Sequence, residues 1–160
     1  METETAVRQL LARALDWTDA HAAYDTAVLD LPPRLQGIRP EGLPHSAWEL
    51  IEHIRITQRD ILDFCTAENY REPNWPEEYW PSTPEPPSEQ AWEQSVGDFR
   101  EDRAALRSLA MDPAIDVGSV VPNGTDQTYI REILLVIDHT ACHVGQLVLV
   151  RRALGAWPGT

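Results

Sequence analysis

The chain has 160 residues, 42% of them hydrophobic, which suits one domain with one core. Its formal net charge is −13, from 26 acidic and 13 basic residues, and this charge repels phosphate backbones and anionic lipid, so we expect neither nucleic acid nor a membrane as a partner. All 13 basic residues are arginine, and without lysine the chain has neither a Schiff-base nucleophile nor a P-loop.

The sequence also predicts a cellular location. Residues 1–10 have neither the basic start nor the apolar run of a secretory signal. The longest uninterrupted aliphatic stretch, residues 133–137, is too short to cross a bilayer. Cys65 and Cys142 both fall inside helical patterns, which indicates two buried thiols rather than a disulfide. We therefore expect a cytoplasmic protein.

The first half of the chain contains two predicted helices. Apolar residues recur every three or four positions over residues 4–29, which predicts a first helix that ends before Pro32-Pro33. Ser46 and Glu49 have the spacing of a capping box, so the second helix should begin at Ser46 and continue to about residue 67.

Residues 69–87, the aromatic excursion, should connect the second helix to the third. The segment is rich in proline and cannot sustain a helix, but it also carries Trp75, Tyr79 and Trp80. Disordered linkers are usually poor in aromatic residues, so we expect the excursion to lie against the bundle. Its rings either form part of a substrate pocket or simply plug one end of the core.

Two more helices are predicted in the second half. The third starts after Ser88 and ends near residue 110, and an irregular segment over residues 112–124 follows it. The fourth begins between residues 125 and 128 and ends at Leu154, before Gly155. Four helices with two long connections predict an all-α fold, a four-helix bundle forming a single domain over residues 1–160.

The fourth predicted helix is apolar on two sides. Its first stripe is Ile130, Ile133, Ile137, Ala141, Val144 and Val148, and its second is Val136, His139, His143, Leu147, Val150 and Leu154. One stripe suffices to pack a helix in a small bundle, so we expect the first stripe to form a second surface and the protein to be a homodimer. The alternative is a wide core, or the aromatic excursion, that covers both stripes.

The second stripe contains a candidate metal site. His139 and His143 lie one helical turn apart, which lets both imidazoles bind one ion. His53 lies on the flank of the second helix's apolar face and is the best third ligand. Three neutral imidazoles leave coordination positions open, as a catalytic metal requires. The alternative is that these are core histidines satisfied by hydrogen bonds.

Two segments carry a resemblance to a known family. The sequences HSAWELIEHIR (residues 45–55) and DHTACHVGQL (residues 138–147), with RRALG at residues 151–155, resemble the DinB-like superfamily of bacterial four-helix bundles. Members typically bind a divalent metal through one histidine of the second helix and two of the last. The resemblance therefore implies His53, His139 and His143 as ligands. Cys142 departs from the family pattern.

Several further residues lie near the predicted site or next to its ligands in the sequence. His21 lies on the predicted core stripe of the first helix. It is either a fourth ligand, a proton carrier or a packed core histidine. Gln146 could orient His143 or be a solvated polar residue. Cys142 is expected to be a small buried hydrophobe, and Glu52 and Asp138 to be surface charges. Trp75 and Trp80 are the candidate pocket residues of the aromatic excursion.

Two functions are compatible with this site. The first is an enzyme whose metal activates a water or a low-molecular-weight thiol for transfer or hydrolysis on a small molecule, and the resemblance implies thiol transferases and isomerases. The second is a non-enzymatic metal- or ligand-binding stress-response bundle that acts through a partner. Zinc and nickel are the first candidate metals, and iron, copper and manganese are the further candidates. Metal affinity should fall as the pH drops through the histidine range near 6.5.

Overall fold

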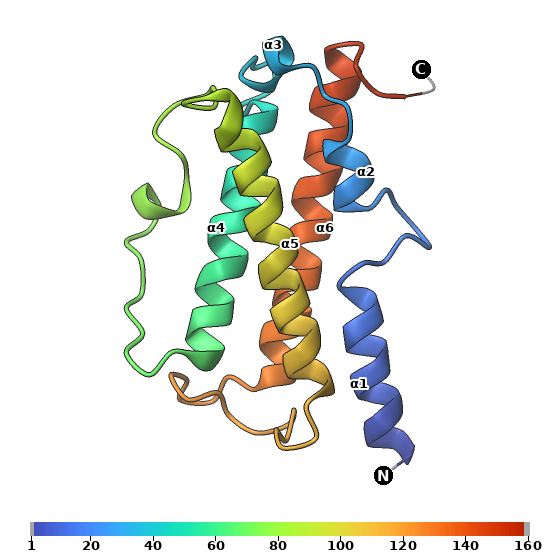
Figure 1. Cartoon of the computed structure of the whole chain (residues 1–160), viewed down its shortest axis with the longest axis vertical. Coiled ribbons are helices and arrows are strands. Elements are labelled where there is room, and N and C mark those ends of the chain that lie inside the picture. Colours follow the sequence, from blue (N-terminus) through green and yellow to red (C-terminus); the bar gives the residue numbers. More distant parts are fainter. Residues whose placement is uncertain (1, 159–160) are drawn as a thin grey trace.

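The computed structural model describes residues 2–158, and its regular structure there is all helical (Figure 1). The helices are α1 (Glu2–Ala14), α2 (Tyr24–Val28), α3 (Pro33–Gln36), α4 (Ala47–Thr66), the 3-10 helix η1 (Glu77–Tyr79), α5 (Glu89–Met111) and α6 (Tyr129–Ala153). The long helices α4, α5 and α6 pack side by side, and α1 lies along α5. The predicted all-α bundle is confirmed.

The start of α4 follows from its sequence. The Ser46 hydroxyl accepts a hydrogen bond from the backbone N–H of Glu49 at 3.2 Å, and the Ser46 N–H donates to Glu49 Oε2 at 2.8 Å. This reciprocal pair satisfies two amides that the first turn of a helix leaves unpaired. The Arg39 side chain adds an ion pair to Glu49. The predicted capping box is confirmed, and it fixes where the helix carrying His53 begins.

The predicted continuous helix over residues 4–29 is wrong. The chain leaves the helical path after Ala14 and resumes it at Tyr24. The break lets one arginine of α5 bind two carboxylates: Arg103 Nη1 lies 2.8 Å from Asp16 Oδ1, and Nη2 lies 2.7 Å from Asp25 Oδ2. Tyr24 then stacks on Phe99, with 3.8 Å between ring centroids. Tertiary contacts with α5 override the local periodicity.

The core is built mainly from α4, α5 and α6. Two clusters of buried side chains follow one another along the bundle, one around Ile51, Phe99 and Leu147 and the other around Leu106 and Ile133. The proposed ligand His53 is 3% exposed, beside the first cluster on α4. The candidate site is therefore held by the two helices that pack most closely in this fold.

Both predicted stripes of α6 face the protein interior. In the first stripe, Ile133 and Val144 are 0% and 2% exposed, and Ile137 and Val148 pack against the core clusters. The expectation that this stripe forms a second surface is wrong, because the core is wide enough to cover it. Burial of this stripe removes the argument for a homodimer, which stays a prediction.

The helix α6 has the length and apolar composition of a membrane span. It is the one helix within residues 2–158 that is long and apolar enough to cross a membrane by composition. A core helix can have the same length and composition. In α6, Ile133, Val144 and Leu147 are buried in the bundle. We therefore interpret α6 as a helix of the bundle that contributes one face to the core.

Candidate metal centre

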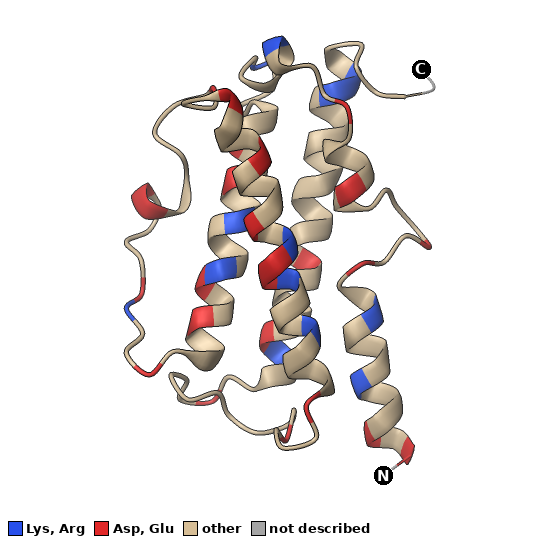
Figure 2. Ribbon diagram, in the orientation of Figure 1, with Lys and Arg blue, Asp and Glu red and all other residues tan. Residues whose placement is uncertain are grey.

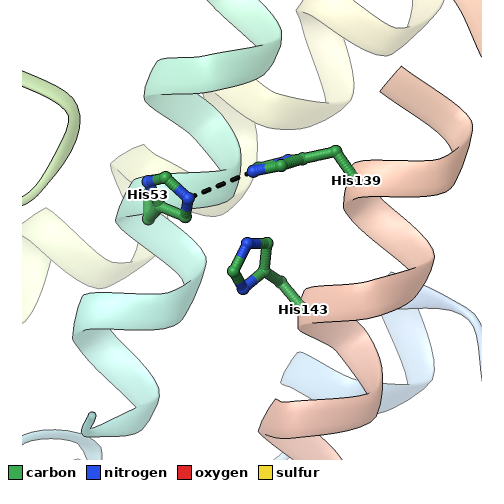
Figure 3. A group of neighbouring side chains, drawn as sticks. All are labelled: His53, His139 and His143. Atoms are coloured by element: carbon green, nitrogen blue, oxygen red, sulfur yellow. Dashed lines mark hydrogen bonds between the residues drawn. The ribbon is translucent and has the colours of Figure 1, made fainter. Parts of the chain in front are cut away.

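Three imidazoles from α4 and α6 converge between these two helices (Figure 3). One ring nitrogen from each of His53, His139 and His143 lies within 4.8 Å of the other two. The Nε2 atoms of His53 and His139 are 3.1 Å apart. Two nitrogens bound to one tetrahedral zinc ion at about 2.0–2.1 Å lie roughly 3.3 Å apart, so this spacing suits a shared ion. The predicted convergence of the three histidines is confirmed.

The aromatic excursion holds the first of these rings. His53 Nδ1 donates a hydrogen bond to the backbone carbonyl of Tyr79 at 2.8 Å, which leaves Nε2 deprotonated, the form that binds a metal ion. In this structure Nε2 accepts a hydrogen bond from His139 Nε2 at 3.1 Å. The indole of Trp80 lies flat on the same imidazole, with 3.9 Å between ring centroids and 3° between planes. The excursion therefore sets both the tautomer and the orientation of His53.

Gln146 holds a second ring. His143 Nδ1 donates to Gln146 Oε1 at 2.7 Å, which leaves His143 Nε2 as the free nitrogen. Figure 3 shows that this nitrogen edge faces the other two rings. Of the two interpretations of Gln146, the structure favours the one in which it orients a ligand.

The pKa values of all three histidines are depressed. Burial lowers the pKa of His53 to about 4, although its bond to the Tyr79 carbonyl opposes the shift. Burial, with His143 and His53 as neighbours, lowers the pKa of His139 to about 3. Burial also lowers the pKa of His143. All three rings are neutral at pH 7, which is the form that binds a metal ion.

Asp60 anchors the aromatic excursion to α4. The Tyr70 hydroxyl donates to Asp60 Oδ1 at 2.8 Å, and the Tyr79 hydroxyl donates to Oδ2 at 2.7 Å. Burial and these bonds raise the pKa of both phenols. Asp60 lies two helical turns after His53, so the same helix carries the ligand and the anchor of the segment that orients it. Sequence reasoning missed this carboxylate, since nothing local marks it.

The sequence of the chain decides its family. The DinB superfamily model matches residues 14–147. The chain belongs to the DinB superfamily. The match contains all three histidines and confirms the resemblance of residues 45–55 and 138–147. No curated protein and no solved structure matches the chain.

Some predicted features of this DinB bundle lie elsewhere than expected. His21 is exposed, in the break between α1 and α2, and its Nδ1 lies 2.9 Å from the Ala22 carbonyl oxygen. Its predicted core position is wrong, and the bundle packing leaves it outside the three-histidine group. Trp75 is also exposed, at 69%, and contacts Tyr79 rather than the centre. Of the two candidate tryptophans, only Trp80 reaches the site.

The two cysteines, and the acids next to the proposed ligands in the sequence, differ in exposure. Cys142 is exposed, so the expectation that it is a buried hydrophobe is wrong. Cys65 is buried, and burial raises its pKa to about 12. Asp138 is exposed, and Glu52 forms an ion pair with Arg55. Asp138 is therefore a surface charge as predicted, whereas the Glu52 side chain is only 15% exposed.

Proposed function

We propose that this DinB-superfamily protein is a divalent-metal-dependent enzyme that acts on a small molecule. The observation that carries the proposal is the convergence of three neutral imidazoles, two of which have their Nδ1 atoms occupied by protein acceptors. A ring held in this way presents Nε2 to the ion without first reorganising. The donor set suits zinc or nickel before iron or manganese.

The residues around the centre have distinct tasks in this proposal. His53, His139 and His143 bind the ion, and Gln146 fixes the orientation of His143. Trp80 covers one face of His53 and keeps water from that side. When bound, the ion supplies Lewis-acid chemistry that lowers the pKa of a water or a thiol, so that a nucleophile exists at neutral pH.

Membership of the DinB superfamily supports a low-molecular-weight thiol as the nucleophile, and hydrolysis is the variant in which water takes its place. A net charge of −13 supports partners other than nucleic acid and anionic membranes.

The alternative is a metal- or ligand-binding bundle without catalytic activity. One observation favours it: within residues 2–158, no carboxylate is hydrogen-bonded to His53, His139 or His143. An enzyme that moves protons usually places an acid or base in reach of the reacting atoms. Turnover by the metal-loaded protein is the measurement that separates the two.

The first experiment is metal analysis of protein purified without an affinity tag, followed by zinc titration against a chromogenic chelator. We expect one ion per chain in the wild type and in His21→Ala, which removes an exposed histidine outside the centre. We expect His139→Ala to lose it. Retention of tight zinc binding by His139→Ala would place the ion elsewhere and contradict the proposal.

The second experiment addresses the reaction. Zinc-loaded wild-type protein is incubated with a low-molecular-weight thiol and a small electrophile, and the thioether product is measured by mass spectrometry. The enzyme proposal predicts turnover that His139→Ala lacks. The same rate in both proteins would favour the non-enzymatic alternative.

A further inference from the structure

A small apolar pocket lies between the segment that precedes α4 and the C-terminal half of α6. Its volume is about 160 Å³. Its apolar wall consists of Leu43, Pro44, Leu50, Leu149 and Val150. An engineered apolar protein cavity of about 150 Å³ accepts benzene, so this pocket has room for a group of about six carbon atoms.

The polar wall of this pocket belongs to the metal centre. Gln146 lines the pocket and holds His143 through its Oε1 atom, while its amide NH₂ donates to no group within residues 2–158. His45 also lines the pocket and stacks on Trp80 at 4.3 Å, and Trp80 in turn stacks on His53. A molecule in the pocket therefore lies against Gln146, which holds His143, and against His45, which stacks on the tryptophan beside His53.

The pocket has no formal charge in a strongly acidic protein. None of its lining residues is Asp, Glu or Arg. Figure 2 shows the same property along the helix: α6 is uncharged between Asp138 and Arg151. Leu149 is 54% exposed in the pocket wall, so an apolar group in the pocket would remove part of this side chain from water.

We propose that this pocket binds the apolar part of the substrate, a neutral group of about six carbons, and that the Gln146 amide donates a hydrogen bond to a carbonyl oxygen beside it. The inference rests on the proposed function, because it assigns a substrate class to the same centre. An apolar wall with a small number of polar groups, here Gln146 and His45, is the usual composition of a small-molecule site. The Gln146 side chain connects this pocket to the three-histidine group through His143.

Hexanamide is the probe that tests this inference, because it combines a five-carbon chain and a carbonyl carbon with an oxygen acceptor. Binding is measured by saturation-transfer NMR and isothermal titration on the full chain, with and without zinc. Acetamide has the same polar end without the chain, and we expect it not to bind measurably. We expect hexanamide to bind in both metal states.

Two variants locate the binding. Leu149→Ser removes part of the apolar wall and should weaken hexanamide binding about tenfold. Leu134→Ser is the matched control, because Leu134 is 50% exposed on the same helix and lies outside the pocket. Gln146→Glu keeps an oxygen for His143 Nδ1 but lacks the amide donor, so it should also weaken binding.

The outcomes separate this inference from the proposed function. Hexanamide binding that Leu149→Ser weakens and Leu134→Ser preserves supports the pocket, even if zinc fails to bind and the proposed function falls. Zinc binding at the histidines without hexanamide binding overturns the pocket and leaves the proposed function standing. Equal hexanamide affinity in the Leu149→Ser and Leu134→Ser variants also overturns it.

Discussion

The bundle has two long connections, and they contact different parts of the molecule. The aromatic excursion runs beside α4 and contacts a proposed ligand through the Tyr79 carbonyl and the Trp80 ring. Residues 112–128 close one end of the bundle, where Asn123 Nδ2 donates to the carbonyls of Phe64 at 3.0 Å and Ala67 at 2.9 Å. Both segments are irregular and contain proline. The two segments differ in where these hydrogen bonds end, on an imidazole of the three-histidine group or on the last turn of α4.

The largest expected effect comes from removing the ligand that the aromatic excursion holds. His53→Ala deletes one of three donors, whereas loss of a supporting partner alone typically costs 10–100-fold in metal affinity. We expect zinc affinity to fall by more than about 100-fold, measured by chelator competition. His21→Ala keeps all three donors and changes an exposed residue outside the three-histidine group, so it serves as the control. Similar affinities in the two variants would mean that the excursion does not border a metal site.

The pH dependence should be the next largest effect. The pKa values of His53 and His139 are about 4 and about 3 in the folded chain, against about 6.5 when unfolded. Because these folded values are depressed, the unfolded chain binds more protons in this range, and the metal-free protein is destabilised as the pH falls from about 6.5 towards 4.

Zinc binding should follow the folded-state pKa values. The sequence predicts that zinc affinity falls near pH 6.5, but burial should preserve binding at pH 5.5 and move the loss to about pH 4. Melting curves with and without zinc at pH 7.5, 5.5 and 4 check this. If zinc no longer raises the melting temperature at pH 5.5, the imidazoles ionise as they do in the unfolded chain.

A smaller effect should follow from releasing the aromatic excursion. Asp60→Ala removes the acceptor of both Tyr70 and Tyr79, so the carbonyl that orients His53 becomes less constrained. We expect zinc affinity to fall about tenfold. Asp63→Ala is the matched control, since Asp63 pairs with Arg59 on the same helix and does not bond to the excursion. Chelator competition is the measurement, and equal affinities in the two variants would contradict this role of Asp60.

The smallest effect should appear at the other connection. Asn123→Ala leaves the two carbonyls of Phe64 and Ala67 without their donor, which should reduce the free energy of unfolding by about 1–3 kcal/mol. Zinc affinity should not change. Asn74→Ala, in the excursion, removes only an exposed bond to Glu78 and should alter stability by less than about 0.5 kcal/mol. Urea denaturation measures both. A loss of zinc affinity in Asn123→Ala would remove the distinction between the connections.

Local chemistry allowed much of the site to be predicted from the sequence. The capping pair of Ser46 and Glu49 marks where α4 begins. The spacing of His139 and His143 puts two imidazoles on one face of α6. The third ligand, His53, follows from its position relative to the apolar face of α4. Each of these inferences needs only neighbours within about one helical turn, so periodicity carries them.

Only the tertiary structure decided the rest. Whether an apolar stripe is covered depends on the neighbouring helices, which is why both stripes of α6 are in the core. The break before Tyr24 exists because Arg103, far along the chain, binds Asp16 and Asp25. The Tyr79 carbonyl that orients His53 has no sequence signature, since every residue has a carbonyl. The depressed pKa of His139 arises from burial among residues that only folding brings together.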